Sequence, residues 1–156
     1  MAETYLVRIP VPREHAEVFE GLLASLPEAV VGRQAPLIDA GVDAFHCSQR
    51  RFWEPEFDDS DMNLAGWVKK LTGMPTITVG SVSLDQDFVS QPNEGDGSTS
   101  KPASIDRLLE MLDRGDFDLV AVGRALIANP DWPKVVRSDD TAGLQAYSKD
   151  LLANLE

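Results

Sequence analysis

The sequence predicts an α/β fold, and two observations support that prediction. Short apolar segments rich in β-branched or aromatic residues alternate with segments whose apolar residues recur at helical spacing. Strands that alternate with helices pair in parallel through right-handed crossovers. We therefore expect about four strand–helix units in a single domain spanning residues 1–156.

Each predicted strand is short and is bounded by Gly or Pro. The four strands are Tyr5–Ile9, Val42–Cys47, Pro75–Val79 and Phe117–Val122. The predicted helices are Glu14–Leu26, Met62–Leu71 and Ile105–Leu112. An eight-unit α/β barrel takes about 250 residues, so four units would form half of such a barrel, a partial (β/α)8 TIM barrel, or a small open α/β sheet.

Two further segments complete the predicted organisation. The segment Ser90–Lys101 is rich in Gly, Ser, Pro and acidic residues, which predicts a surface loop. A C-terminal helix is predicted within residues 138–156, because helical spacing over Thr141–Leu155 places four apolar or aromatic residues on one side. These are Leu144, Tyr147, Leu151 and Leu155.

Charge and composition exclude several classes of function. The net charge is −12, from 26 acidic and 14 basic residues, so the chain repels a phosphate backbone and nucleic acid is not an expected partner. The single cysteine, Cys47, cannot form an internal disulfide, which fits a reducing compartment. No apolar run approaches the ~20 residues of a membrane span, and the N-terminus lacks a signal-peptide pattern. We expect a cytoplasmic protein that does not bind membranes.

Two strand ends share one pattern that is typical of a phosphate site. In "TITVGSVSL" and "DLVAVGRAL" an apolar strand ends in Gly80-Ser81 or in Gly123-Arg124. Glycine lets the backbone approach a ligand closely, consecutive N–H groups can bind phosphate oxygens, and arginine adds a forked, charged donor. Either glycine alone could simply end a strand. The matched pair favours a phosphate between neighbouring strands at the carboxyl edge of the sheet.

Three stretches between Ala35 and Arg137 carry a family resemblance. They read "LIDAGVDAFHCSQRRFWEPEF", "LTGMPTITVGSVSL" and "FDLVAVGRALIANPDWPKVVR". In these stretches the chain resembles the C-terminal half of the Old Yellow Enzyme family, which are FMN-dependent NAD(P)H:flavin oxidoreductases and ene-reductases with a (β/α)8 barrel. The resemblance covers residues 35–137 and leaves residues 1–34 without a clear counterpart.

The resemblance implies FMN as the cofactor and NAD(P)H as the reductant. It places the FMN phosphate at the last two strand ends, on Val79, Gly80, Ser81, Val122, Gly123 and Arg124. It also implies that Arg8, in "YLVRI", faces the N1/O2 edge of the flavin, where a cation stabilises the anionic reduced ring.

No catalytic residue can be assigned from the resemblance. The family's N-terminal half supplies the pair that polarises the substrate carbonyl, and neither His15 nor His46 has the HxxN or HxxH spacing of that pair. His46 and Cys47 are expected to be structural residues of a strand, with His46 retained as a site candidate because it lies near the strand's carboxyl end.

Other polar residues have alternative interpretations. Arg50 and Arg51 either approach the cofactor or form ion pairs with the acidic run Glu54–Asp61. That run lacks regular metal-ligand spacing, so no metal is expected there. Asp131 is a candidate N-cap for a short helix.

The resemblance predicts a reaction in which hydride passes from NAD(P)H to the flavin and then to the β-carbon of an activated alkene, with an incomplete active site here. The alternative is a half-barrel that binds a flavin or another phosphate compound, or serves as an assembly module, without activity of its own. A fragment with no independent activity is a third possibility. A half-barrel alone would leave sheet edges and its inner face in water, so we expect a homo-oligomer or a separate partner half-barrel.

Overall fold

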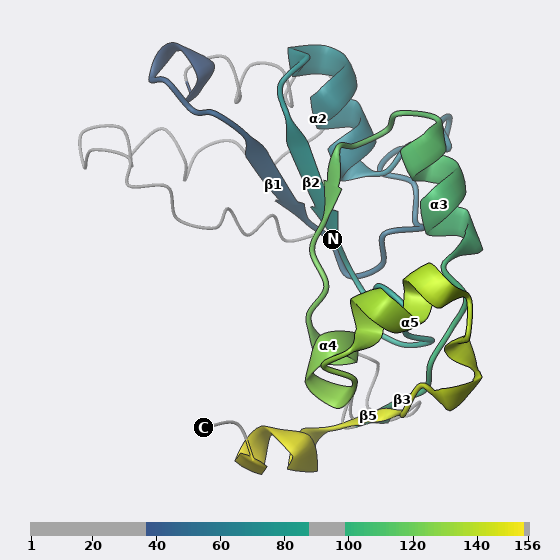
Figure 1. The fold of residues 1–156 in the computed structure, drawn as a ribbon. Helices are drawn as coiled ribbons and strands as arrows, with labels where there is room; N and C mark the ends of the chain where they lie inside the picture. The colour runs from purple at the N-terminus through teal and green to yellow at the C-terminus, as the bar shows by residue number, and fades with distance from the viewer. Residues whose placement is uncertain (1–36, 88–98, 155–156) are drawn as a thin grey trace.

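A small parallel sheet forms the centre of the computed structural model, which describes residues 37–87 and 99–154 (Figure 1). The strands lie in the order β1-β2-β4 and all pair in parallel. They cover Phe45–Ser48 (β1), Thr76–Val79 (β2) and Leu119–Val120 (β4). The predicted α/β class with parallel pairing is therefore confirmed for these three strands. The predicted strand Tyr5–Ile9 and the predicted helix Glu14–Leu26 lie outside the described residues.

Helices cover one face of this sheet. Figure 1 shows α2 and α3 on the same side of the strands. The helices are α2 (Leu64–Thr72), α3 (Asp106–Asp113), α4 (Arg124–Ala128) and α5 (Trp132–Ser138). The first two agree with the predicted helices to within a few residues.

The strand side chains alternate between a buried face and a less buried face, as the pleat requires. On the first face Phe45, Cys47, Thr76 and Thr78 are buried. Leu119 belongs to the other face, because it pairs with Ile77, and it is 58% exposed. β4 is also an edge strand of this sheet. The described residues thus form a sheet with helices on one face and a partly open second face.

Helix α2 begins and ends at residues suited to those positions. The side chain of Asn63 accepts a hydrogen bond from the Gly66 N–H at 2.9 Å, and Gly73 ends the helix with a left-handed backbone, φ 67°. Asn63 is fully buried, and its Nδ2 donates to the Phe52 carbonyl and to the Thr78 hydroxyl. One side chain therefore ties the helix, the preceding loop and strand β2 together.

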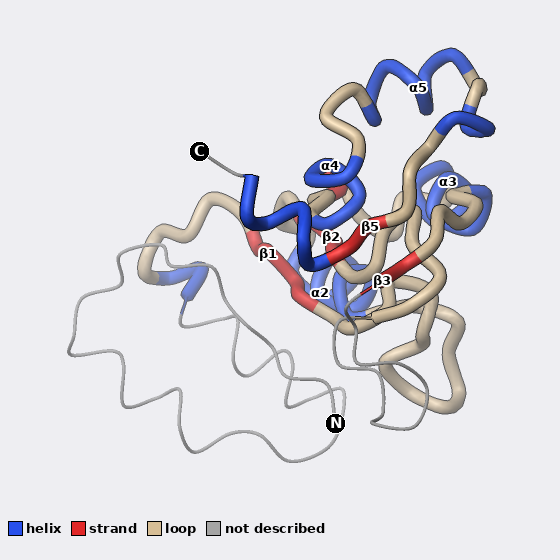
Figure 2. Tube along the Cα trace, turned by 90° about the horizontal axis from the view of Figure 1, so that it is seen from below, coloured by secondary structure: helices blue, strands red, loops and turns tan. Residues whose placement is uncertain are grey.

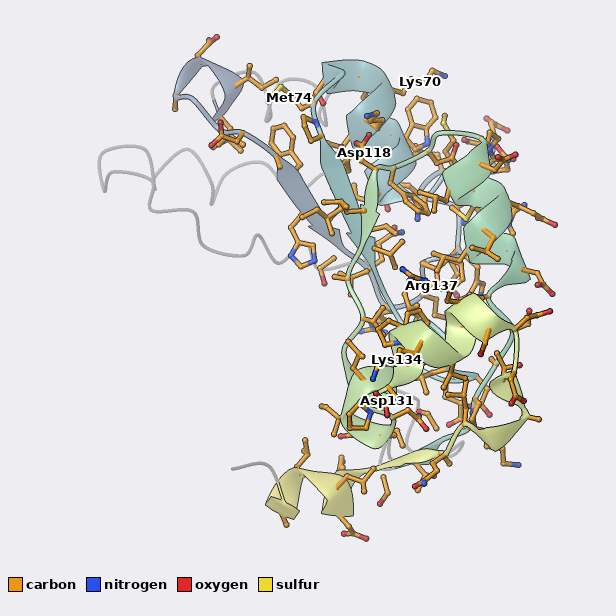
Figure 3. The ribbon with its side chains drawn as sticks, in the orientation of Figure 1. Lys70, Met74, Asp118, Asp131, Lys134 and Arg137 are labelled. Atoms are coloured by element: carbon orange, nitrogen blue, oxygen red, sulfur yellow. The ribbon has the colours of Figure 1, made fainter. Side chains whose placement is uncertain are left out.

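An ion pair between Lys69 and Asp118, the residue labelled in Figure 3, fixes the amino ends of β2 and β4. The Lys69 Nζ donates to both Asp118 carboxylate oxygens at 2.5 and 2.6 Å. The same carboxylate accepts a hydrogen bond from the Thr76 N–H at 2.8 Å. The Lys69 contact, and then the Thr76 contact, lower the pKa of Asp118. This end of the sheet is thus held by side-chain contacts as well as by strand pairing.

The prediction of a C-terminal helix is wrong for the described part of residues 138–156. Helix α5 ends at Ser138, where Asp139 takes a left-handed backbone, φ 58°. Two 3-10 stretches, Thr141–Gly143 and Lys149–Asn154, flank the short strand β5, Tyr147–Ser148. Tyr147 is 1% exposed, so burial of its ring and pairing of its strand override the helical spacing.

The predicted surface loop Ser90–Lys101 also contains an element that the prediction missed. Thr99–Ser100 forms strand β3, which pairs antiparallel with β5 in a two-stranded ribbon. Residues 88–98 of this segment lie outside the described residues. Within residues 37–87 and 99–154, no helix combines the length and the apolar character that crossing a membrane requires.

Candidate functional site

The structure brings the two predicted glycine turns together at the carboxyl edge of the sheet. The Gly80-Ser81 turn follows β2, and the Gly123-Arg124 turn follows β4. The Arg124 Nη2 donates to the Ser81 Oγ at 3.1 Å, across 43 residues of sequence. Strands β2 and β4 are neighbours in the sheet. The prediction that these two turns are neighbours in space is therefore confirmed.

Arg124 is the centre of this site. Besides Ser81, its Nη1 donates to the Ser100 Oγ at 2.8 Å and its Nη2 donates to the Gln86 carbonyl at 2.8 Å. The guanidinium also lies over the Tyr147 ring, with Cζ 5.6 Å from the ring centroid. Figure 2 shows the ribbon of β3 and β5 beside α4, the helix that begins with Arg124. These partners come from three separate segments of the chain.

Every hydrogen-bond acceptor around Arg124 in the described residues is neutral. The guanidinium has five N–H donors, and three are used, so two have no acceptor within this part of the chain. No ion pair joins Arg124 to a carboxylate among residues 37–87 and 99–154. A partly buried cation without a counter-ion favours binding of an anion.

Burial lowers the pKa of Arg124, and the nearby Tyr147, Asp87 and Asp85 oppose that shift. The group stays protonated at any physiological pH, because an arginine pKa lies far above neutrality. Asp85 and Asp87 reduce the attraction for an anion without neutralising Arg124 by direct contact. Arg124 therefore keeps its charge without a direct ion pair in the described residues.

Gly80 lies in a crowded turn. Its backbone has φ +147°, and a Cβ at this position would lie 2.5 Å from the Gln49 carbonyl oxygen. The Gly80 carbonyl accepts from the Phe52 N–H at 3.0 Å, and the Val79 carbonyl accepts from the Gln49 N–H at 3.1 Å. The close approach that requires glycine here is therefore to the loop after β1. The predicted role of Gly80 in binding a phosphate stays a prediction, because this contact explains the need for glycine without involving a ligand.

Gly123 lies in open surroundings. A Cβ at this position would meet no atom within 4 Å, and φ is −107°. The Gly123 carbonyl accepts hydrogen bonds from the Leu126 and Ile127 N–H groups. Val122, the other residue expected to contribute backbone, packs partly buried against the hydrophobic core. Space for a ligand atom therefore lies at Gly123.

The turn after β2 has an unusual backbone. Ser81 and Ser83 both have positive φ values, 49° and 60°. Non-glycine residues seldom adopt this conformation, and such strain clusters at functional sites. The Ser81 Oγ donates to the Arg50 carbonyl at 2.8 Å while it accepts from Arg124. These contacts hold the Ser81 hydroxyl at a fixed position beside the guanidinium.

The two arginines after β1 differ in their contacts. Arg51 forms ion pairs with Glu54 at 2.6 Å and with the buried Asp87 at 3.1 Å. This matches the ion-pair interpretation for Arg51. Arg50 is exposed, and its backbone carbonyl holds Ser81. Arg50 therefore contributes to the turn through its backbone.

The other candidate residues have structural surroundings. Cys47 is buried as predicted, and burial with the nearby Glu56 raises the pKa of its thiol to about 12. The His46 Nε2 is buried without a hydrogen-bond partner in the described structure. Asp131 precedes α5, yet its side chain makes no cap hydrogen bond and instead pairs with Lys134 at 2.7 Å (Figure 3). Asp131 nevertheless occupies the predicted N-cap position of α5, where its backbone carbonyl accepts from the Lys134 and Val135 N–H groups. Among the described residues, no group of His, Cys, Asp and Glu side chains is placed to hold a metal ion.

Three residues of the site were not predicted from the sequence. Ser100, Gln86 and Tyr147 contact Arg124, and no local pattern marks any of them. Arg8, the predicted flavin ligand, lies outside the described residues.

No protein-family model matches this chain, and neither does any curated protein sequence.

Proposed function

We propose that this chain binds FMN as an oxidoreductase of the Old Yellow Enzyme type, to which its sequence is similar. The observation that supports the proposal most is the partly buried guanidinium of Arg124, which within the described residues has only neutral acceptors and two N–H donors without one. The monoester phosphate of FMN is an anion with oxygen acceptors that match such donors. The neighbouring strands β2 and β4 are proposed to be consecutive strands of a partial (β/α)8 barrel.

The residues at the site would hold the phosphate in distinct ways. Arg124 would donate its two unused N–H groups, and Ser81 would fix the orientation of the guanidinium. The open space at Gly123 would admit a phosphate oxygen close to the backbone. Bound FMN would accept hydride from NAD(P)H and deliver it to the β-carbon of an activated alkene.

The phosphate contribution can be measured by comparing FMN with riboflavin, which lacks the phosphate. Flavin fluorescence titrations should show FMN binding at least about tenfold more tightly than riboflavin. Arg124→Ala should abolish that difference and leave riboflavin binding unchanged. Arg137→Ala, which removes an exposed arginine on α5, is the matched control and should preserve it. Equal affinities for FMN and riboflavin in the natural chain would refute the phosphate site.

A second candidate function, a flavin-binding or assembly half-barrel without activity of its own, is favoured by the open face and edge of the sheet. Leu119 is 58% exposed on edge strand β4. An exposed apolar edge strand favours pairing with another chain. A second copy or a separate partner half-barrel would cover it.

Two measurements separate these functions. NAD(P)H oxidation by the FMN-loaded chain supports the oxidoreductase, whereas FMN binding without oxidation supports the module. Sedimentation should show a dimer or larger assembly that Leu119→Lys shifts toward monomer. Leu109→Lys, on the exposed side of α3, is the control for adding a charge at an exposed leucine. A stable monomer of the natural chain would contradict the half-barrel.

A further inference from the structure

The C-terminal segment reaches the candidate site through the β3–β5 ribbon. In this ribbon Thr99 pairs with Ser148, and Ser100 pairs with Tyr147. Both members of the second pair contact Arg124: the Ser100 hydroxyl accepts from Nη1 at 2.8 Å, and the Tyr147 ring lies under the guanidinium. Tyr147 is 1% exposed and Ser100 is 2% exposed. The ribbon therefore supplies two buried contacts to one cation.

A second contact fixes this segment to the helix that carries Arg124. Asn129 follows the last residue of α4, and its Nδ2 donates to the Gln145 carbonyl at 3.0 Å. The Gln145 N–H donates to the Asn129 Oδ1 at 2.7 Å. One amide side chain thus bonds both backbone groups of Gln145. Because α4 begins at Arg124 and ends before Asn129, the C-terminal segment contacts the first residue of this helix and the residue that follows its last.

Resting on the proposed phosphate site, we propose that the β3–β5 ribbon positions Arg124, so that docking of the C-terminal segment and binding of a phosphate-bearing ligand favour one another. An arginine side chain has many rotamers, and a ligand must otherwise immobilise it. Ser100 and Tyr147 restrict the guanidinium before the ligand binds. Linkage then requires the reciprocal effect, in which the bound ligand stabilises the docked segment.

The contacts of Arg124 allow the C-terminal segment and a phosphate-bearing ligand to bind this residue at the same time. The ribbon accepts only one of the five guanidinium N–H groups, at Ser100, and Tyr147 covers a face of the group. The two N–H donors that have no acceptor in the described part of the chain stay available at the edge of the guanidinium. A segment that competed with the ligand would occupy those donors. Docking therefore orients Arg124 without saturating it.

Tyrosine variants test the ligand side of this coupling. Tyr147→Leu removes the ring under Arg124 and should weaken binding of FMN, measured by fluorescence, about fivefold to tenfold. Tyr147→Phe keeps the ring and should retain affinity within about twofold. Asn129→Ala changes no residue that contacts Arg124 directly, yet it should weaken binding severalfold, because the loss of both Gln145 hydrogen bonds loosens the segment that carries Tyr147. Equal affinity of Tyr147→Leu, Asn129→Ala and the natural chain would overturn the proposal.

Hydrogen exchange tests the reciprocal side. Saturating FMN or inorganic phosphate should slow exchange of the amides at positions 144–150, and Tyr147→Phe should show the same slowing. The Gln145 N–H, which donates to Asn129, is the most direct reporter. Amides of α2, which does not contact Arg124, serve as the internal control and should not respond. Unchanged exchange at 144–150 on binding would contradict the coupling, because a purely structural Tyr147 would not respond to ligand.

An experiment without ligand separates failure of this proposal from failure of the proposed function. Arg124→Ala in the absence of any ligand should speed exchange at 144–150 severalfold, since the ribbon loses its contact to the guanidinium. Arg124→Lys should show nearly the same fast exchange as Arg124→Ala, because an ammonium group lacks the planar, forked donors of a guanidinium. Should the natural chain bind neither FMN nor phosphate, the phosphate site fails, and so does coupling to such a ligand. Unchanged exchange in Arg124→Ala refutes positioning by the ribbon even where FMN binds.

Discussion

Gly80 and Gly123 occupy matching places in the sequence, each between an apolar strand and a polar residue, and their surroundings are opposite. The space for a Cβ at Gly80 is filled by the Gln49 carbonyl oxygen at 2.5 Å, whereas the space at Gly123 is empty to 4 Å. Gly80 is buried and Gly123 is exposed. The same motif thus packs against a neighbouring loop at one strand end and leaves open space at the other.

The largest effect is expected for a methyl group added at the crowded turn. Gly80→Ala must move backbone atoms of the loop after β1 and adopt an unfavourable φ, so it should lower the free energy of unfolding by about 3 kcal/mol. Gly123→Ala is the matched control and should change stability by less than about 0.5 kcal/mol. Urea denaturation of both variants measures the difference. Equal destabilisation would show that the two turns are alike.

The next largest effect is expected at Asn63, which bonds the loop after β1 to strand β2 near the Gly80 turn. Asn63→Ala removes the cap of α2 and both hydrogen bonds donated to Phe52 and Thr78. Buried acceptors would lose their donors, so unfolding should become easier by about 2 kcal/mol. Asp59→Ala, at an exposed position of the same loop, is the control for the urea midpoint. If Asn63→Ala lowered the free energy of unfolding no more than Asp59→Ala does, the Asn63 hydrogen bonds would not support the Gly80 turn.

The open turn should respond in ligand affinity instead of stability. Gly123→Val fills the empty space beside Arg124 and should weaken FMN binding about tenfold, or about 1.4 kcal/mol, while riboflavin affinity stays the same. Isothermal titration with both flavins measures this. Gly123→Ala should weaken FMN binding less than Gly123→Val does. Normal FMN affinity of Gly123→Val would indicate that the open space is not part of the phosphate site.

The smallest effect concerns the opposite end of the same strands and depends on pH. The pKa of Asp118 is lowered in the folded chain, so its contacts stabilise the fold above its unfolded pKa of about 4. That stability is lost as pH falls through the folded value. The pair is partly exposed, so Asp118→Asn should destabilise the protein by less than about 1 kcal/mol at pH 7, and by less still at pH 3. Thermal unfolding across this pH range, with Asp113→Asn as an exposed control, should show the difference narrowing as pH falls.

The strands and the meeting of the two turns could be predicted because their signals are local. Apolar runs that end in glycine locate β2 and β4, and parallel neighbours present their carboxyl ends at one edge, so Ser81 and Arg124 were expected to be close. The reason for glycine at position 80 could not be predicted, since the carbonyl that excludes a side chain belongs to Gln49, 31 residues away.

The C-terminal part of the site could not be predicted for a related reason. Tyr147 lies at helical spacing with Leu144 and Leu151, and that pattern predicted a helix. The ring instead lies under Arg124, and its strand pairs with Ser100 in a segment with the composition of a loop. Both contacts depend on residues more than 20 positions away, and no local period encodes them.

The contact between Asp118 and Thr76 fixes a common starting point for the two chain segments that lead to Ser81 and Arg124. From this contact the chain runs five residues from Thr76 to Ser81 and six residues from Asp118 to Arg124. A strand advances about 3.3 Å per residue. Deleting one residue between Asp118 and Arg124 would leave Arg124 short of Ser81, and deleting one between Thr76 and Ser81 would leave Ser81 short of Arg124. The lengths of these two segments are therefore matched to each other, and a one-residue change in either one alone should separate Ser81 from Arg124.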